Sequence, residues 1–386
     1  METIERKTCR LCGGETFKDI LSLGDIYVSD FVQKSKVQDG IKAPLDLVLC
    51  GDCELLQLRH TAPQELLYAR HYWYKSALNK VIVDDLRELA EIAESFMQPL
   101  DTILDIGAND GTLLSFVDPK FVRIGCEPAD NLQKDLEKNC DIAIHDFWSI
   151  DKYEYPRAKV VLAIGMFYDM EDPNQFVRDA AKAMTDDGIF IAQLMTLKPM
   201  LEKNDFANIC HEHLEYYSYK NLVRLFETNG LEIFKVEENS INGGSYRLFA
   251  RKLSKGSIQH EESYSFLLFT EHVKRSKERA VEFVKVARAE GKKIYGYGAS
   301  TKGNTILQYY NLDNVWIEGI ADKNPDKIGK YTVGTGIPIV DQDKVRAEAD
   351  YFFILPWGFT DTFVKEEREK GFKGKFIVSI PEFRVI

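Results

Sequence analysis

Two pairs of cysteines have the spacing of a metal site. Two residues separate Cys9 from Cys12, and two separate Cys50 from Cys53. This spacing lets both sulfurs of a turn face a common point, and four thiolates are the ligands that tetrahedral zinc prefers. Seven cysteines in 386 residues are too few for a disulfide scaffold. The pattern therefore predicts a structural zinc ion that leaves no position open for water; four unrelated buried thiols are the alternative.

Acidic residues and glycines at the ends of successive predicted strands could bind a nucleoside. A strand at 102–106 is followed by a glycine-containing turn and a helix, and Glu127 ends the next strand, where a carboxylate can accept hydrogen bonds from ribose hydroxyls. The dinucleotide fingerprint lacks its third glycine, so S-adenosylmethionine fits better than NAD. A turn that binds nothing is the alternative. The predicted cofactor-binding residues are Asp105, Gly107, Asn109, Gly111, Glu127, Asp146, Phe147 and Ile164.

The run His211-Glu212-His213, followed by Tyr216 and Tyr217, collects groups that could move protons near neutral pH. It differs from the zinc-protease motif, which needs two residues between the glutamate and the second histidine. Taken alone, solvated or core histidines explain the run better than catalysis does.

A second glycine-containing turn, at 296–304, also follows a predicted strand and opens a helix. Small residues there bring backbone amides and a helix N-terminus toward an anion, and Lys302 stands nearby, which suits a nucleotide diphosphate. Asp322 holds the place where such domains commonly meet a ribose. A plain turn with Lys302 in solvent is the alternative, and NAD is not implied because the glycine triplet is incomplete.

The elements that must position these residues predict an α/β fold. Short apolar runs alternate with amphipathic segments over 102–195 and again over 293–355, which indicates two parallel sheets built from βαβ units. Residues 45–49 alternate like a half-exposed strand, and helical periodicity extends over 63–96 and 264–290. We expect a zinc-binding module over 1–62, a helical connector over 63–100, a Rossmann-like domain over 101–260, and a helical linker with a C-terminal Rossmann-like domain over 261–386.

Composition narrows the class of protein further. The chain is 45% hydrophobic and 29% charged, with a net charge of −11, which is typical of a globular protein and disfavours a broad nucleic-acid or membrane footprint. The first residues are polar, and no stretch approaches the roughly 20 apolar residues that span a bilayer. We therefore expect a cytoplasmic protein.

The sequence resembles the sugar C-methyltransferases that act on nucleotide-linked 4-keto-deoxysugars, over nearly its whole length. The resemblance rests on both cysteine pairs and on the segments 72–76, 104–107, 211–213, 242–247 and 298–305. It implies a zinc-bearing N-terminal domain, a central class I Rossmann-like methyltransferase domain over 101–260 and a C-terminal Rossmann-like domain, with the sugar nucleotide held between them. In this family a base removes the C3 proton of the sugar, and the resulting enolate takes a methyl group from S-adenosylmethionine.

The resemblance also implies roles for individual residues. His213 is expected to be the base, assisted by Glu212 and His211, while Tyr72 or Tyr74 could donate to the oxyanion or hold the sugar, although aromatic residues at such spacing are more often core. A competing assignment gives the proton to Tyr74 or another residue and leaves His213 as a binding group. The expected substrate-binding residues are Tyr72, Lys75, Ser76, Asn242, Tyr246, Arg247, Lys302 and Asn304.

Two positions depart from the family pattern. Relatives often have a tyrosine where this chain has Cys210, and their histidine after the fourth strand has no counterpart in residues 164–169. Two other functions stay open from the sequence. One is an O- or N-methyltransferase that acts on a related nucleotide sugar or small molecule. The other is a non-enzymatic zinc-ribbon module that binds protein or nucleic acid, which the acidic composition disfavours.

Overall fold

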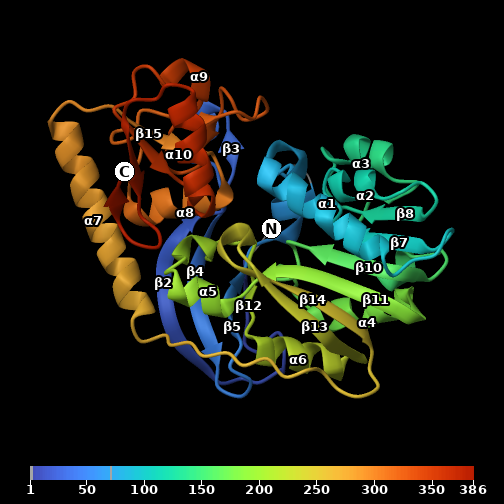
Figure 1. Ribbon diagram of the computed structural model, residues 1–386. Helices are drawn as coiled ribbons and strands as arrows, with labels where there is room; N and C mark the ends of the chain where they lie inside the picture. The colour runs from blue at the N-terminus through green and yellow to red at the C-terminus, as the bar shows by residue number, and fades with distance from the viewer. Residues whose placement is uncertain (1–2, 70–71) are drawn as a thin grey trace.

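The computed structural model describes residues 3–69 and 72–386. Their backbone forms a four-stranded, a seven-stranded and a six-stranded sheet, with two short strand pairs beside them. Figure 1 shows the seven-stranded sheet on one side of the molecule, the six-stranded sheet on the other, and the N-terminal strands between and beneath them. The predicted α/β fold class is confirmed. Among the described residues, no helix combines the length and the apolar character that crossing a bilayer requires.

The central sheet has the strand order β13-β14-β11-β10-β7-β8-β9. The five neighbouring strands β11, β10, β7, β8 and β9 are parallel, and β14 runs antiparallel to β11. Helices cover both faces, which is why β7 is buried at every residue. The strands are β7 (Thr102–Ile106), β8 (Val122–Cys126), β9 (Ile142–Ile144), β10 (Ala158–Ile164), β11 (Met184–Met195), β13 (Leu231–Asn239) and β14 (Ser245–Lys252).

Two groups of helices flank this sheet. One group packs against β-strand residues such as Ile103 and Leu162, and the other packs against Leu104 and Val161, which point to the opposite face. The first group is α1 (Lys80–Glu94), α2 (Thr112–Phe116) and α3 (Gln133–Asn139); the second is α4 (Pro173–Ala183) and α6 (Tyr219–Thr228), while the short α5 (Leu197–Glu202) follows β11.

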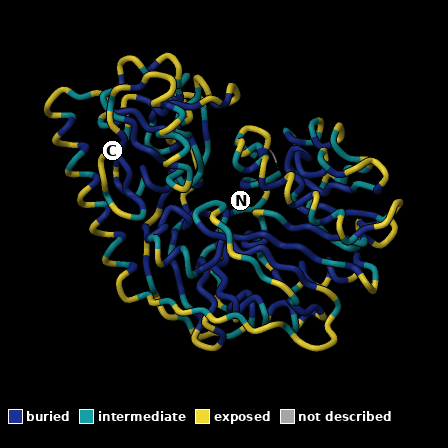
Figure 2. Tube along the Cα trace, viewed as in Figure 1, coloured by how far each residue is buried: buried dark blue, intermediate teal, exposed yellow. Residues whose placement is uncertain are grey.

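The C-terminal sheet has the order β18-β16-β15-β19-β20-β21, parallel except for its last strand. Helix α7 (Phe269–Ala289) runs along its outside, with one face buried and the other exposed in Figure 2. The other elements are β15 (Ile294–Tyr297), α8 (Thr301–Tyr310), β16 (Ile320–Asp322), β18 (Ile339–Asp341), α9 (Gln342–Val345), β19 (Tyr351–Ile354), α10 (Thr360–Glu369), β20 (Lys375–Val378) and β21 (Arg384–Val385).

The N-terminal module touches both larger sheets. Its own sheet has the order β12-β5-β4-β2, in which β12 (Glu215–Tyr216) comes from the chain that follows β11, so one strand of this sheet is supplied by the region of the central sheet. On the other side, β3 (Phe31–Val32) pairs with β17 (Tyr331–Thr332). The remaining strands are β1 (Ile4–Glu5), β2 (Phe17–Tyr27), β4 (Lys42–Cys50), β5 (Leu56–Leu58) and β6 (His60–Thr61).

The segment before α1 differs from the helical prediction over 63–96. A short π-helix covers Glu65–Ala69, residues 72–75 have no helical structure, and α1 begins only at Lys80, where Asn79 caps it. The residues after Tyr72 form hydrogen bonds with the loop after β7. These bonds, and not the hydrogen bonds of a helix, fix their backbone.

Arg10 joins the N-terminal module to the region of the central sheet through a buried side chain. Its guanidinium donates to the backbone oxygen of Leu58 (2.5 Å) and to Thr61 (2.6 Å), and it lies 3.4 Å from Glu171 and 3.7 Å from the fully buried Glu215. A buried arginine with this many acceptors fixes the two regions in one arrangement.

We expect Arg10→Met to destabilise the protein by about 3–5 kcal/mol, because it leaves Glu215 buried without its cation. Arg59→Met is the matched control: Arg59 pairs with Asp19, which is 85% exposed, so the expected loss is at most about 1 kcal/mol. Urea unfolding of both variants measures the difference. Equal losses would show that the buried contacts of Arg10 do not hold the two regions together.

Candidate active site

A cavity of about 710 Å³ lies where the carboxyl ends of the two parallel sheets face each other. Its lining comes from the loops after β7, β8 and β10 on one side and after β15, β16 and β19 on the other. The strand order reverses between β7 and β10 in the seven-stranded sheet and between β15 and β19 in the six-stranded sheet. Ligands of open α/β sheets bind at such points, so both sheets present their binding edges to one space.

Strand register brings the predicted cofactor residues together. Ile106 pairs with Cys126, so Gly107 and Glu127 leave the sheet side by side. Gly107 has φ +75°, and a Cβ at this position would lie 2.8 Å from Cγ of Met166. The turn therefore needs glycine both for its backbone conformation and for its close approach to the loop after β10.

Glu127 is held by the backbone of its own site. Its Oε2 accepts a hydrogen bond from the Asn109 N–H (3.0 Å) and its Oε1 accepts one from the Ala129 N–H (3.0 Å). Burial raises the pKa of Glu127 to about 7, and burial together with the charge of Glu127 raises the pKa of Asp105 to about 8. Two carboxyls in a desolvated pocket favour a cationic ligand, which would stabilise their ionised forms.

Asp146, Phe147 and Ile164 also line this part of the cavity. The side chain of Asp146 accepts from the Phe147 N–H (2.8 Å) and contacts Lys152, whose hydrogen bond holds the pKa of Asp146 below its usual range. The prediction that Gly111 binds the cofactor is wrong, because this residue lies outside the cavity lining. Gly111 is instead the N-cap of α2, with φ +75°, and a Cβ there would clash with Asn139.

The segment after residue 71 lines the cavity beside the predicted cofactor turn. Its lining residues include Tyr72, Tyr74, Lys75 and Ser76. The Asn109 amide donates to the Tyr74 backbone oxygen (3.1 Å) and accepts from the Ser76 N–H (3.1 Å). Lys75 lies 3.8 Å from Asp135 of α3 and 3.5 Å from Asp326 in the loop after β16, so it reaches elements of both regions. The same loop that forms the cofactor turn thus positions the predicted substrate residues.

The His211-Glu212-His213 run is only partly directed into the cavity. Glu212 and His213 line it, whereas His211 is 3% exposed and its Nε2 lies 2.9 Å from the Ala43 backbone oxygen of the N-terminal module. Burial also lowers the pKa of His211 to about 4. A catalytic part for His211 is therefore wrong in this fold: the residue attaches the loop to the module.

His213 has a different partner from the one expected. Its Nδ1 lies 2.9 Å from the backbone oxygen of Asn208, and its ring contacts Tyr168 edge-on at 4.6 Å. Burial and the nearby charge of Lys302 lower the pKa of His213 to about 3. The expectation that Glu212 raises the basicity of His213 is therefore wrong, because a backbone carbonyl orients the ring.

Three predicted substrate residues lie outside the cavity lining. Arg247 pairs with Asp85 (2.9 Å) and with Glu88 (2.8 Å), the Tyr246 hydroxyl donates to Glu262, and the Asn304 amide donates to Ser29 of the N-terminal module. These predictions are wrong because each side chain is already committed to a tertiary contact. Asn242 and Lys302 do line the cavity, and the Lys302 ammonium lies 3.0 Å from Sδ of Met195.

Sequence reasoning missed several residues of the lining. Asp169, Tyr68 and Tyr168 lie beside Glu212 and His213, and the buried Lys327 donates to the Ala299 backbone oxygen (2.8 Å) on the opposite side. The one available signal was the position of Asp169, because it follows the fourth strand, in the stretch where the family's histidine has no counterpart.

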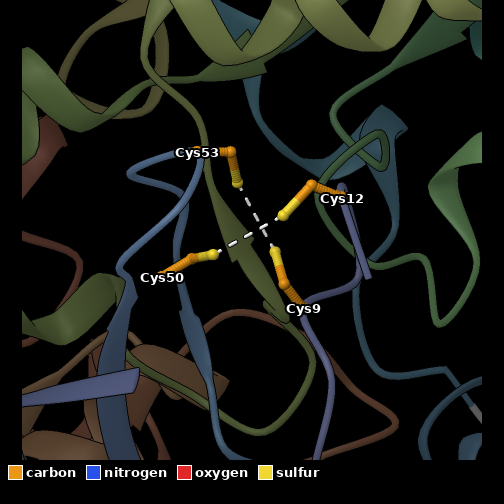
Figure 3. A group of neighbouring side chains, drawn as sticks. All are labelled: Cys9, Cys12, Cys50 and Cys53. Atoms are coloured by element: carbon orange, nitrogen blue, oxygen red, sulfur yellow. Dashed lines mark hydrogen bonds between the residues drawn. The ribbon is translucent and has the colours of Figure 1, made fainter. Parts of the chain in front are cut away.

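The four cysteines of the predicted metal site meet outside this cavity. All four sulfurs lie within 4.8 Å of one another, with Cys9–Cys53 and Cys12–Cys50 each at 3.6 Å, and Figure 3 shows them pointing toward a common centre. A tetrahedron with Zn–S bonds of about 2.3 Å has sulfur separations near 3.8 Å, which fits. N–H groups of Gln57 (3.1 Å) and Gly14 (3.4 Å) donate to Cys9 and Cys12, as suits thiolates.

Comparison with known proteins matches family models to three consecutive parts of the chain. A "Putative zinc binding domain" matches residues 9–68, a "Methyltransferase domain" matches 72–236, and a "C-methyltransferase C-terminal domain" matches 240–381. C-methyltransferase NovU of Streptomyces niveus is 28% identical over 407 residues, which cover 98% of this chain and 96% of that protein.

Solved methyltransferase structures also resemble parts of the chain. The mitomycin 7-O-methyltransferase MmcR is 18% identical with a TM-score of 0.39, over 46% of this chain and 56% of that one. CalO1, a methyltransferase in calicheamicin biosynthesis, is 15% identical with a TM-score of 0.35, over 45% of this chain and 54% of that one.

The matched domains make the chain a methyltransferase that uses S-adenosylmethionine and carries a zinc-binding cysteine cluster. The three consecutive matches and the similarity to NovU confirm the resemblance to sugar C-methyltransferases seen in the sequence. The alternative of a non-enzymatic zinc module is wrong, because a methyltransferase domain matches the central region.

We expect one zinc ion per chain, and Cys12→Ser to lose it and unfold the N-terminal module, because the remaining thiolates no longer close the tetrahedron. Cys140→Ser is the control, since Cys140 lies outside the cluster. Elemental analysis with thermal unfolding measures both effects. Substantially less than one zinc in the folded wild-type protein would contradict the prediction.

Binding of S-adenosylmethionine should release protons at pH 7. Its positive charge favours ionised Glu127 and Asp105, whose raised pKa values of about 7 and 8 leave them partly protonated in the free protein. Affinity therefore rises with pH up to about 8 and then levels off. Calorimetry in two buffers of different ionisation enthalpy counts the protons.

Two variants sharpen this measurement. Glu127→Ala should weaken binding by about 1.5–3 kcal/mol, the range for hydrogen bonds to a charged group, and reduce the proton release. Asp146→Asn should leave the proton release unchanged, because the pKa of Asp146 is already lowered and the group stays ionised. Proton uptake on binding, or unchanged affinity in Glu127→Ala, would place the cofactor elsewhere.

Proposed function

We propose that this enzyme transfers a methyl group from S-adenosylmethionine to C3 of a nucleotide-linked 4-keto-deoxysugar through an enolate. The observation that supports this most is the single cavity shared by two binding edges. One edge has the nucleoside-type turn of Gly107 and Glu127, and the other has a helix N-terminus with Lys302. A substrate with a nucleotide at one end and a sugar at the other can span the cavity and present its sugar to the cofactor.

The chemistry needs little besides positioning. S-adenosylmethionine supplies the methyl sulfonium when it is bound. The side chains of this chain must hold the sugar, take the C3 proton and stabilise the developing oxyanion. The segment with Tyr72, Tyr74, Lys75 and Ser76 lies beside the Gly107 turn, where it can orient the sugar, and Asn242 also lines the cavity. The first turn of α8, with Lys302, binds the nucleotide-linked end.

The acceptor atom follows from the family. An O- or N-methyltransferase would need no enolate and fits the cavity equally well, but the matched C-terminal domain and the relative NovU are both named for C-methylation. We keep the boundaries 1–62, 63–100, 101–260 and 261–386 as our division of the chain. We place the enzyme in the cytoplasm, because a reducing compartment keeps the four cysteines available for zinc.

Enzyme-dependent exchange tests this function directly. We expect the protein in heavy water, without S-adenosylmethionine, to exchange the C3 hydrogen of one member of a panel of 4-keto-6-deoxyhexoses. The panel is linked to thymidine, uridine, cytidine or guanosine diphosphate, and samples without enzyme are the control. With S-adenosylmethionine the same sugar should gain a methyl group on carbon, which proton NMR shows as an upfield singlet. A methyl group on oxygen or nitrogen would establish the alternative acceptor.

A further inference from the structure

Asn109 connects the predicted cofactor turn to the segment 72–79. Its backbone N–H donates to Oε2 of Glu127 (3.0 Å), its side-chain amide donates to the Tyr74 backbone oxygen (3.1 Å), and its side-chain oxygen accepts from the Ser76 N–H (3.1 Å). The residue is 8% exposed and lines the cavity. One residue therefore contacts both the carboxylate expected to bind the ribose and the segment expected to hold the sugar.

These contacts depend on an unusual backbone conformation. Asn109 has φ +54°, in the left-handed region that residues other than glycine seldom adopt, although asparagine adopts it more often than most. Such a conformation costs free energy and persists only where the surrounding contacts hold it. A ligand that requires the formed turn therefore also favours the attached position of the segment 72–79, and the reverse holds too.

The segment 72–79 is attached to the cofactor loops at two further points. The Tyr72 N–H donates to Oδ1 of Asn131 (2.8 Å), and the Asn131 amide donates back to the Tyr72 oxygen (3.1 Å). The Ala77 N–H donates to Oδ2 of Asp110 (3.0 Å). Side chains of the loops after β7 and β8 thus satisfy the backbone of the segment, so its order depends on those loops.

On its other side the segment reaches the two remaining regions of the chain. The Trp73 indole N–H donates to Oδ1 of Asp30 in the N-terminal module (2.8 Å), and Lys75 lies 3.5 Å from Asp326 in the C-terminal region. The segment 72–79 therefore links the cofactor turn to both regions, and a change at the turn can reach the rest of the cavity through it.

We propose that Asn109 is a positioning residue that couples the binding of the two ligands. S-adenosylmethionine on the Gly107 turn fixes Asn109, Asn109 fixes the segment 72–79, and the sugar nucleotide then binds more tightly. The identity of the second ligand rests on the proposed function, whereas the coupling between the cofactor and the segment does not. Each ligand raises the affinity of the other by the same factor, which for coupled sites is about 5–150.

Asn109→Gly tests the coupling, because glycine keeps the left-handed backbone and the N–H to Glu127 and removes only the amide side chain. We expect saturating S-adenosylhomocysteine to slow amide hydrogen exchange over 72–79 by about 5–150-fold in the wild-type protein, and by less than about twofold in this variant. Asn311→Gly is the matched control: Asn311 also has φ +54°, but it caps the C-terminal end of α8 outside the cavity lining, so the slowing should persist.

Ser76→Pro breaks the same link from the side of the segment. Proline lacks the N–H that Asn109 accepts, and the extended backbone of Lys75 (φ −123°, ψ 122°) suits a following proline. This variant should reduce the slowing by S-adenosylhomocysteine. Ser76→Ala is its control, because it keeps the N–H and removes only the hydroxyl, so the slowing should stay at the wild-type value.

A binding measurement extends the test to the substrate. For the sugar of the panel whose C3 hydrogen exchanges, S-adenosylhomocysteine should tighten binding by about 5–150-fold in the wild-type protein and by less than about twofold in Asn109→Gly. A merely structural role of Asn109 would weaken both ligands and leave this ratio at the wild-type value, which overturns the proposal.

The hydrogen-exchange result decides the proposal by itself if no sugar of the panel binds, an outcome in which the proposed function fails. The proposal is overturned if S-adenosylhomocysteine does not slow exchange over 72–79 in the wild-type protein, or if it slows exchange equally in Asn109→Gly. Where Asn109→Gly does not fold, equal slowing in the wild-type protein and in Ser76→Pro overturns it.

Discussion

The pairing of β12 with β5 is the contact on which the active site depends. It makes residues 215–216, which directly follow the His211-Glu212-His213 run, the edge strand of the sheet in the zinc-bearing module. Leu58 donates its N–H to the Leu214 oxygen (2.9 Å), and the Asn221 amide donates to the Cys53 oxygen (2.7 Å) beside the metal cluster. The cysteine cluster is outside the cavity, yet it fixes the strand that carries a wall of the cavity.

Desolvated carboxyls dominate the electrostatics of the cavity. Asp105 and Glu127 lie beside the Gly107 turn, Asp169 and Glu212 lie in the loops after β10 and before β12, and burial raises the pKa of each. A cavity lined in this way limits its own negative charge until a cation enters. A sulfonium ligand supplies that cation, so its arrival would help ionise the carboxyls that bind it and would increase the local field at the sugar.

Local patterns were predictable from the sequence, and contacts between distant segments were not. The cysteine pairs and the Gly107 turn are set by spacing and backbone conformation within a few residues, so their chemistry could be inferred before the fold was known. Arg247 and Asn304 were misassigned because their partners, Asp85 and Ser29, are more than 150 residues away. A polar side chain in a motif looks free until the segment that pairs with it is placed.

The difference between His213 and Asp169 has a similar physical origin. In the sequence, a histidine beside a glutamate suggests a base near neutral pH, because the ordinary pKa of imidazole lies there. Burial reverses that order, since it penalises the cationic form of histidine and the anionic form of aspartate. In the same cavity the pKa of His213 falls and the pKa of Asp169 rises, so each side chain keeps its neutral form. The protonation state of each side chain is therefore decided by desolvation, which depends on the assembled fold and not on the neighbouring residue in the chain.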